Sequence, residues 1–137
     1  TPQSDIDKLP AKDKLFISNL GIELKPYLPD QLVYLRNTKA ILFPTKYGEG
    51  LSRVVMEAIY LEIPLLVSRN QGTEEILPFD YKYFIKSNNP STLSEQLQEL
   101  INDHNYFDII APYRKKLRKY YSSKVSIEIF LDLLNNK

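Results

Sequence analysis

The sequence contains no cysteine and only one histidine in its 137 residues. The missing cysteine excludes disulfides, thiol catalysis and zinc–thiolate sites together. The net charge is only +1, so no overall charge attracts the chain to nucleic acid or to an acidic membrane. No apolar run approaches the roughly 20 residues that a membrane helix requires, and the polar start, Thr1 to Lys14, does not resemble a signal peptide. We expect a cytoplasmic protein that does not bind nucleic acid.

Length and composition predict one globular domain over residues 1–137. The content of 43% hydrophobic and 26% charged residues is that of a soluble protein with a core, and the length is too small for two ordinary domains. We place the core at about residues 15–104 and a set of C-terminal helices at about 105–136. Because the chain begins at Thr1 without an initiator Met, we interpret it as a piece of a longer protein and its domain as incomplete.

Hydrophobic patterning predicts alternating strands and helices after a polar loop at residues 1–13. Short apolar runs without alternation are typical of strands buried on both faces of a parallel sheet. We expect extended segments at 15–18, 24–28, 39–44, 64–68 and 83–85. We expect helices that begin at 29–31, span 53–61 and 73–77, begin at 90 with a cap from Ser87 or Ser91, and span 106–121 and 126–134.

This alternation indicates βαβ units, so we predict an α/β fold with a Rossmann-like parallel sheet flanked by helices. Sheets of this kind bind ligands beyond the carboxyl ends of their strands. The turn at residues 45–52 follows the strand at 39–44 and precedes the helix at 53–61. It is therefore the first place in which to look for a site.

The segment from Gly48 to Ala58 has features of a diphosphate site. The first N–H groups of a helix lack partners and carry the positive end of its dipole, which favours an anion. Gly50 allows a ligand to approach the backbone closely. Glu57 lies about 6 Å along the helix from Arg53, where its carboxylate can accept hydrogen bonds from the vicinal diol of a ribose. Glu49 then lies on the side of the sugar; the alternative is that Glu49 and Glu57 are both merely solvated.

These residues carry a family resemblance that runs from about Tyr27 to the C-terminus. The spacing of Glu49 and Glu57 resembles the E-x7-E motif of the GT-B glycosyltransferases, of the family-four type (group 1). The run at 40–44, Pro64 with the strand after it, and the turn at 71–75 are also similar to the donor-binding, C-terminal domain of that family. The resemblance implies a retaining glycosyltransferase.

The resemblance also implies a role for each matching residue. Glu49 would be catalytic, contacting donor-sugar hydroxyls and stabilising the developing oxocarbenium charge. Glu57 would hold the ribose hydroxyls. The backbone amides would bind the sugar and the diphosphate, from Gly50, Leu51 and Ser52 and from Arg53 and Val54 respectively. Tyr27 or Leu28 would lie near the base. The family needs no cofactor and usually no metal, and no Asp-x-Asp motif or histidine cluster occurs in the chain.

The partners that the resemblance implies are a nucleotide-diphosphate sugar and a glycan or lipid acceptor, with a role in cell-surface polysaccharide synthesis. Two parts of the family pattern are missing: the acceptor-binding N-terminal domain, and the strand and loop that supply an Arg and a Lys to the diphosphate. We therefore expect a partial site that does not turn over alone. Two alternatives stay open, a non-catalytic binding or interaction module and a nucleotide-sugar epimerase-like GT-B protein.

Two further features receive mainly structural interpretations. His104 lies at a predicted helix junction, where a surface position is favoured over catalysis. The basic run from Arg114 to Lys119 favours a solvated helix face, although peripheral contact with a membrane surface is an alternative.

Overall fold

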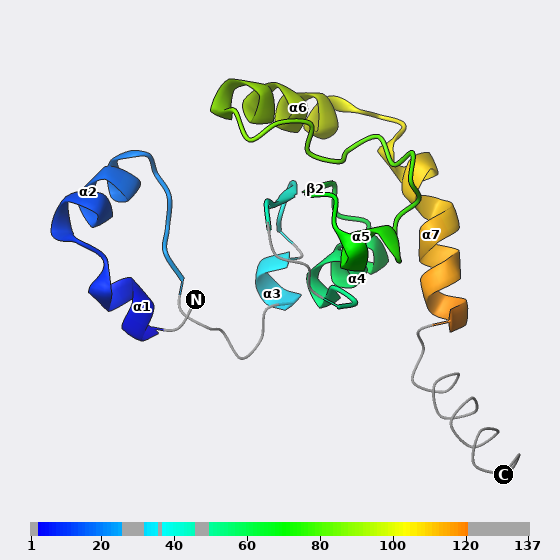
Figure 1. The fold of residues 1–137 in the computed structure, drawn as a ribbon, viewed down its shortest axis with the longest axis horizontal. Coiled ribbons are helices and arrows are strands. Elements are labelled where there is room, and N and C mark those ends of the chain that lie inside the picture. Colours follow the sequence, from blue (N-terminus) through cyan, green and yellow to red (C-terminus); the bar gives the residue numbers. More distant parts are fainter. Residues whose placement is uncertain (1–2, 26–31, 36, 46–49, 121–137) are drawn as a thin grey trace, which may run out of the picture. The chain divides into compact units, whose positions relative to one another are not determined.

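The computed structural model describes residues 3–25, 32–35, 37–45 and 50–120. The chain divides into two compact units, Thr1–Tyr34 and Leu35–Lys137, which are described separately. Figure 1 shows the elements, which are α1 (Gln3–Lys8), α2 (Ala11–Asn19), α3 (Leu32–Leu35), β1 (Ile41–Phe43), α4 (Arg53–Tyr60), β2 (Leu65–Val67), α5 (Gln71–Glu74), α6 (Pro90–Asn102) and α7 (Tyr106–Tyr120). The prediction of one domain with its core at 15–104 stays a prediction.

The first unit is helical where the sequence predicted a loop and a strand. Helix α1 lies in the predicted loop at 1–13, and α2 contains the whole of the predicted strand at 15–18. A short apolar run fits either structure, and the local signals favour a helix: Pro10 precedes the first turn, and Gly21 ends the helix with a left-handed φ of 70°. Of the predicted extended segment 24–28, the described residues Leu24 and Lys25 are irregular.

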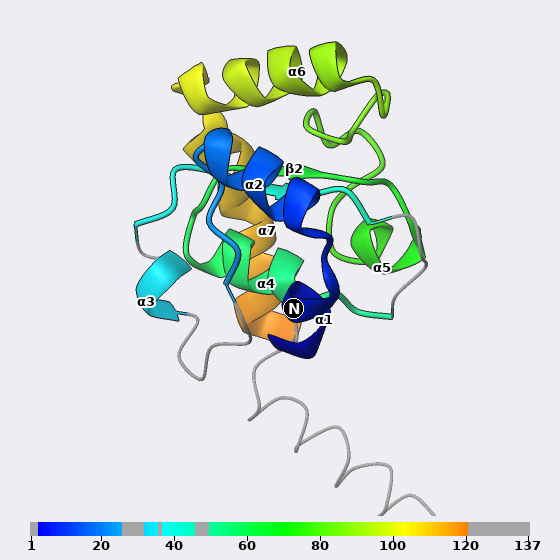
Figure 2. The ribbon, with the colours of Figure 1, turned by 90° about the vertical axis from the view of Figure 1, so that its left-hand side faces the viewer.

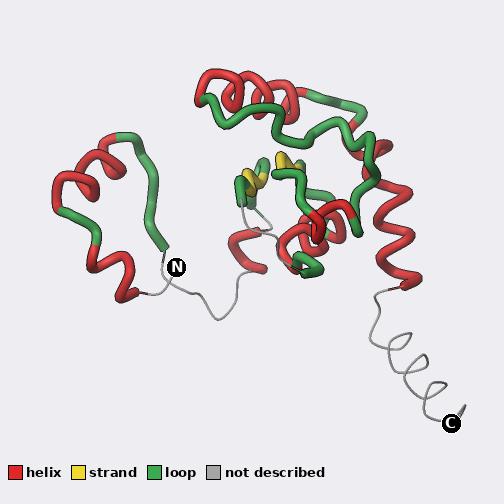
Figure 3. The backbone as a smooth tube through the Cα atoms, in the orientation of Figure 1, coloured by secondary structure: helices red, strands yellow, loops and turns green. Residues whose placement is uncertain are grey.

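The second unit contains a small parallel sheet. Strand β1 pairs with β2 in the register Ile41↔Leu65 to Phe43↔Val67, which confirms the strands predicted at 39–44 and 64–68. The strand predicted at 83–85 is reduced to a parallel bridge between Phe84 and Val67. Figure 3 shows how little of the described chain is strand.

Burial differs between the two strands. Each residue of β2 is buried, as expected for a strand with helices on both sides. The expectation that β1 is buried on both faces is wrong, because the Leu42 side chain is 42% exposed. Strand β1 has one hydrogen-bonded neighbour in the described sheet, so it lies at an edge.

Helices cover both faces of this sheet. Helices α4 and α6 each contact β2, and Figures 1 and 2 agree in placing them on opposite sides of it. Helix α7 packs against α4. The sequence explains α4, because its buried residues Val55, Ala58 and Ile59 follow helical spacing. The order of layers agrees with the predicted α/β class, and the buried core is formed by residues of the second unit.

Helix α4 ends in a Schellman motif. The N–H groups of Glu62 and Ile63 donate to the carbonyls of Ile59 and Ala58, at 3.2 and 2.9 Å. Glu62 adopts the left-handed conformation that this motif requires, with a φ of 59°. Its carboxylate also forms an ion pair with Arg114 of α7. The end of α4 is thereby joined to the helix that covers it.

Two buried tyrosines hold β2 in place. The Tyr81 hydroxyl donates to the Leu65 carbonyl at 2.7 Å, and the Tyr106 hydroxyl donates to the Ile63 carbonyl at 3.1 Å. Burial raises the pKa of Tyr81 far above its usual range and that of Tyr106 to about 12. Both hydroxyls therefore remain hydrogen-bond donors at any ordinary pH.

The other helix predictions have mixed outcomes. Helix α7 matches its prediction over the described residues. Helix α5 spans Gln71–Glu74 and not the predicted 73–77; it begins earlier because Asn70 caps it and forms a capping box with Thr73. Asn89 caps α6 in place of Ser87 or Ser91: its side chain accepts from the Ser91 amide at 2.9 Å. The predicted helix start at 29–31 and helix at 126–134 lie outside the described residues.

None of the described helices is long and apolar enough to cross a membrane.

Candidate functional site

The described part of the turn between β1 and α4 is open to solvent. Gly50 and Leu51 are exposed, and a Cβ atom added to Gly50 would meet no atom within 4 Å. Gly50 is thus surrounded by free space on the side where a side chain would stand. That a ligand approaches the Gly50 backbone stays a prediction, with which this free space agrees.

The N-terminus of α4 offers unused hydrogen-bonding groups. Ser52 is the N-cap residue, and its carbonyl accepts the first helical bond, from the Met56 amide at 3.1 Å. The N–H groups of Arg53, Val54 and Val55 precede this bond and have no partner within the helix. The Ser52 side chain makes no capping bond; it is only 2% exposed, and its Oγ has no hydrogen-bond partner. A buried hydroxyl without a partner is uncommon, and a bound water, ion or ligand is a usual explanation for one.

Glu57 lies one helical turn beyond this end of α4. Its side chain is half-buried, whereas Arg53, four residues earlier, is exposed. Within the described part of the chain, neither residue forms an ion pair. The carboxylate and the guanidinium are therefore both available to a ligand.

The structure brings together most of the residues predicted for the donor site. Those on the turn and the first part of α4 are Gly50, Leu51, Ser52, Arg53, Val54 and Glu57. Glu49, Tyr27 and Leu28 lie outside the described residues, as does the turn at 47–49. The chemical role of each residue stays a prediction.

Sequence reasoning missed a second feature, a hollow of about 290 Å³ at the carboxyl ends of the strands. Its polar lining residues are Thr45, Ser68, Arg69, Lys86, Ser87 and Asn88. Thr45 follows β1, Ser68 and Arg69 follow β2, and the others follow the Phe84 bridge. Parallel sheets bind ligands beyond the carboxyl ends of all their strands, and this rule also indicates these residues. The prediction from the sequence covered only the turn after Phe43.

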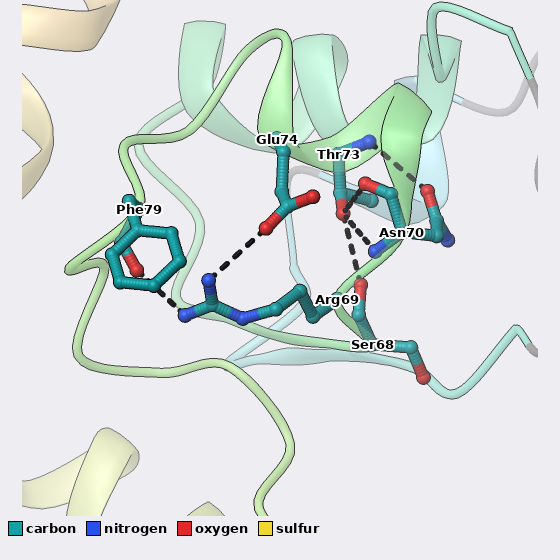
Figure 4. Close-up of polar contacts among 6 residues, drawn as sticks. All are labelled: Ser68, Arg69, Asn70, Thr73, Glu74 and Phe79. Atoms are coloured by element: carbon teal, nitrogen blue, oxygen red, sulfur yellow. Dashed lines mark hydrogen bonds and ion pairs between the residues drawn. The ribbon is translucent and has the colours of Figure 1, made fainter.

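Polar contacts fix two of the lining residues, Ser68 and Arg69, and Figure 4 shows these contacts. The Arg69 guanidinium donates to the Phe79 carbonyl at 2.6 Å and pairs with Glu74 at 3.0 Å. It also stacks on the Phe79 and Phe84 rings, 4.4 and 4.3 Å from their centroids. The buried Thr73 hydroxyl lies 3.0 Å from the Ser68 carbonyl and so joins α5 to the end of β2.

The remaining candidate residues have structural surroundings. His104 is exposed between α6 and α7, as the surface interpretation predicted. In the basic run, Lys115, Lys116, Arg118 and Lys119 are exposed, which agrees with a solvated face and with the membrane-contact alternative alike. Arg114 is half-buried in its pair with Glu62. Among the described residues, no group of three or more His, Asp or Glu side chains is placed to hold a metal ion.

Comparisons with known proteins identify the family. A family model described as "Glycosyl transferases group 1" matches residues 12–123. No curated protein and no solved structure gives a significant match. The matched segment includes the sheet, the N-terminus of α4 and the hollow at the strand ends. Because the match spans well over half of the sequence, the chain belongs to the group 1 glycosyltransferases, a family of transferases that move sugar units.

Proposed function

We propose that this chain forms part of the nucleotide-sugar-binding domain of a retaining glycosyltransferase of the GT-B type. The observation that carries the proposal is the N-terminus of α4, where free backbone donors stand beside the buried, unpartnered Ser52 hydroxyl. This helix end follows the carboxyl end of a parallel strand, where α/β sheets bind their ligands. The family match supports the reaction class.

The diphosphate of the donor would bind at this helix end. The backbone N–H groups of Arg53 and Val54 would donate to its oxygens, and the helix dipole favours the negative charge. The Ser52 hydroxyl would gain the partner that it lacks. The exposed Arg53 side chain adds a positive charge near the same position.

The two glutamates would bind hydroxyl groups and not phosphate. Glu57 lies one turn beyond the proposed diphosphate, and the half-buried position of its side chain suits the ribose diol. Glu49 would lie toward the donor sugar, where a carboxylate stabilises the positive charge that develops at the anomeric carbon. This separation keeps the carboxylates from repelling the diphosphate.

The reaction would break the bond between the anomeric carbon and the diphosphate and form a bond from this carbon to an acceptor oxygen with retained configuration, and the proton of the acceptor hydroxyl would pass to the leaving diphosphate. The diphosphate leaves with the electron pair of the broken bond, so donors at α4 would stabilise its growing charge. We propose a glycan or lipid acceptor and a role in cell-surface polysaccharide synthesis, with no metal required.

An NMR titration with UDP, GDP and ADP tests this proposal. We expect saturable shifts that cluster at residues 50–57 with one of the three nucleotides, which also identifies the base. Glu57→Ala should weaken binding at least about tenfold, since a hydrogen bond to a charged group is worth about 1.5–3 kcal/mol. Glu95→Ala, at an exposed position of α6, is the matched control and should bind like the wild type. Absence of binding by all three nucleotides would contradict the proposal.

A further inference from the structure

The hollow at the strand ends is lined by polar side chains that the protein itself does not use. In the described part of the chain, the side chains of Thr45, Ser68 and Asn88 form no hydrogen bond. The Ser87 hydroxyl accepts from the Asn89 amide at 3.1 Å, which leaves its proton free to donate. Several unused hydroxyl and amide groups therefore converge on one place, as in sites that bind hydroxyl-rich ligands.

Lys86 gives this hollow its free positive charge. Arg69 is paired with Glu74, and its guanidinium is held by the Phe79 carbonyl and the Phe84 ring. It therefore lines the hollow without offering an unpaired charge to a ligand. Lys86 is exposed and forms no ion pair with any described residue. None of the lining residues that the structure describes carries a carboxylate. A ligand with one negative charge is therefore favoured over a neutral or cationic one.

The position and size of the hollow fit a small unit beside the proposed donor. Thr45 and Gly50 are five residues apart in one connection, so their Cα atoms lie at most about 18 Å from each other. The volume of about 290 Å³ lies at the lower end of the range for ligand pockets, which starts at roughly 300 Å³. This space suits a single sugar ring more than a nucleotide.

We propose that this hollow binds one sugar unit that carries an acidic group, a carboxylate or a phosphate, as part of the acceptor glycan. Lys86 pairs with the acidic group, while Thr45, Ser68 and Asn88 bind the ring hydroxyls. The identification of the ligand as part of the acceptor rests on the proposed function, because the transfer proposed there requires an acceptor beside the donor. The inference that the hollow binds an acidic sugar does not depend on the proposed function.

The test is an NMR titration of the chain with sodium glucuronate, glucose and inorganic phosphate at constant ionic strength. We expect glucuronate to shift the amides of Thr45, Ser68, Lys86 and Asn88 saturably, with a Kd on the order of millimolar. Glucose and phosphate should each bind at least about fivefold more weakly, because each offers only half of the contacts. If glucose binds as tightly as glucuronate, the ligand needs no acidic group; if phosphate binds as tightly, it needs no sugar ring. Either result would overturn the proposal.

Matched variants separate the role of Lys86 from overall charge. Lys86→Gln should weaken glucuronate binding at least about fivefold, and Lys115→Gln removes the same charge from an exposed position on α7 and should not. Equal affinities for the two variants, or no glucuronate shifts in the wild type, would refute the proposal.

A second titration with saturating UDP, GDP or ADP distinguishes the acceptor from the donor. Glucuronate should bind with unchanged affinity, whereas competition would place it in the donor site and refute the assignment to the acceptor. Failure of all three nucleotides to shift residues 50–57 would contradict the proposed function instead. The two outcomes are distinguishable because nucleotide binding and glucuronate binding are followed at different amides.

Discussion

Ser52 has surroundings that the fold alone does not explain. A serine at the N-cap of a helix normally accepts a hydrogen bond from the first turn, but here its hydroxyl is buried and unpartnered. Leaving a polar group in this state costs about 1–3 kcal/mol. We infer that the hydroxyl is retained for a ligand and not for stability.

This inference predicts opposite effects of Ser52→Ala on stability and on binding. The variant should be as stable as the wild type or up to about 1 kcal/mol more stable, since it removes a desolvated hydroxyl that makes no bond. Its affinity for the nucleotide should fall severalfold. Urea unfolding and nucleotide titration measure the two effects. A marked loss of stability would show that the hydroxyl has a structural partner and would contradict the inference.

Asp103 is the described carboxylate whose pKa departs most clearly from its usual range. The Tyr83 hydroxyl, the Lys82 ammonium and the Asn105 amide, in this order, lower the pKa of Asp103 to about 2. Asp103 caps the end of α6, and Tyr83 lies next to the Phe84 bridge. The carboxylate therefore joins α6 to the segment that leads to the hollow.

The lowered pKa of Asp103 predicts how stability depends on pH. The unfolded carboxyl has a pKa of about 3.9, so its stabilising contribution is present above this pH and is lost as the pH falls toward 2. Asp103→Asn should lower the melting temperature at pH 7 and flatten its decline between about pH 4 and pH 2. Asp80→Asn, at an exposed position, is the control. Parallel melting curves for wild type and Asp103→Asn would contradict this account.

At the scale of elements, β2 depends on hydroxyl groups from outside the sheet. The Leu65 carbonyl of β2 accepts from Tyr81, and the Ile63 carbonyl, just before the strand, accepts from Tyr106. The two hydroxyls lie 3.4 Å apart in the core. Removing one of them leaves a buried carbonyl short of a donor, which is more costly than the bond itself.

Tyr81→Phe should therefore lower the free energy of unfolding by about 1–3 kcal/mol, although the ring is kept. Tyr60→Phe removes a hydroxyl from a tyrosine that is 53% exposed and should change stability by less than about 0.5 kcal/mol. Urea unfolding of both variants provides the measurement. Equal stabilities would mean that water replaces the Tyr81 hydroxyl.

The elements that the sequence predicted best are those in which several signals agree. Helix α4 combines helical spacing of apolar residues with a preceding turn, and β2 is a fully apolar run between turn residues. Residues 15–18 show the limit of this method. The run is apolar but short, and the capping signals at Pro10 and Gly21 that favour a helix lie outside it.

At the scale of the whole molecule, the sequence predicts one of the two candidate sites, the donor site, and does not predict the hollow. The donor site lies within one continuous stretch of sequence, so spacing and turn chemistry indicate it. The hollow is formed by three separate strand ends that only the fold brings together. Thr45, Ser68 and Lys86 have no shared motif, and each is an ordinary turn residue when taken alone.

The buried core of the described chain lies in the second unit, between Ser52 and Leu117. The family match covers this entire range. Both proposed sites lie at the carboxyl edge of its small sheet, one at the N-terminus of α4 and one at the strand-end hollow. The proposed contacts to the diphosphate, to the ribose and in the hollow therefore all belong to the second unit.

The most direct test of the central claim is a thermodynamic cycle between Glu57 and the ribose. The nucleoside diphosphate that binds best and its 2′,3′-dideoxy analogue are titrated into the wild type and into Glu57→Ala. The account predicts that the analogue binds the wild type about tenfold more weakly and binds the variant as well as the parent nucleotide does, a coupling of about 1.4 kcal/mol. Equal losses in both proteins would contradict the claim that Glu57 holds the ribose of a donor at the start of α4.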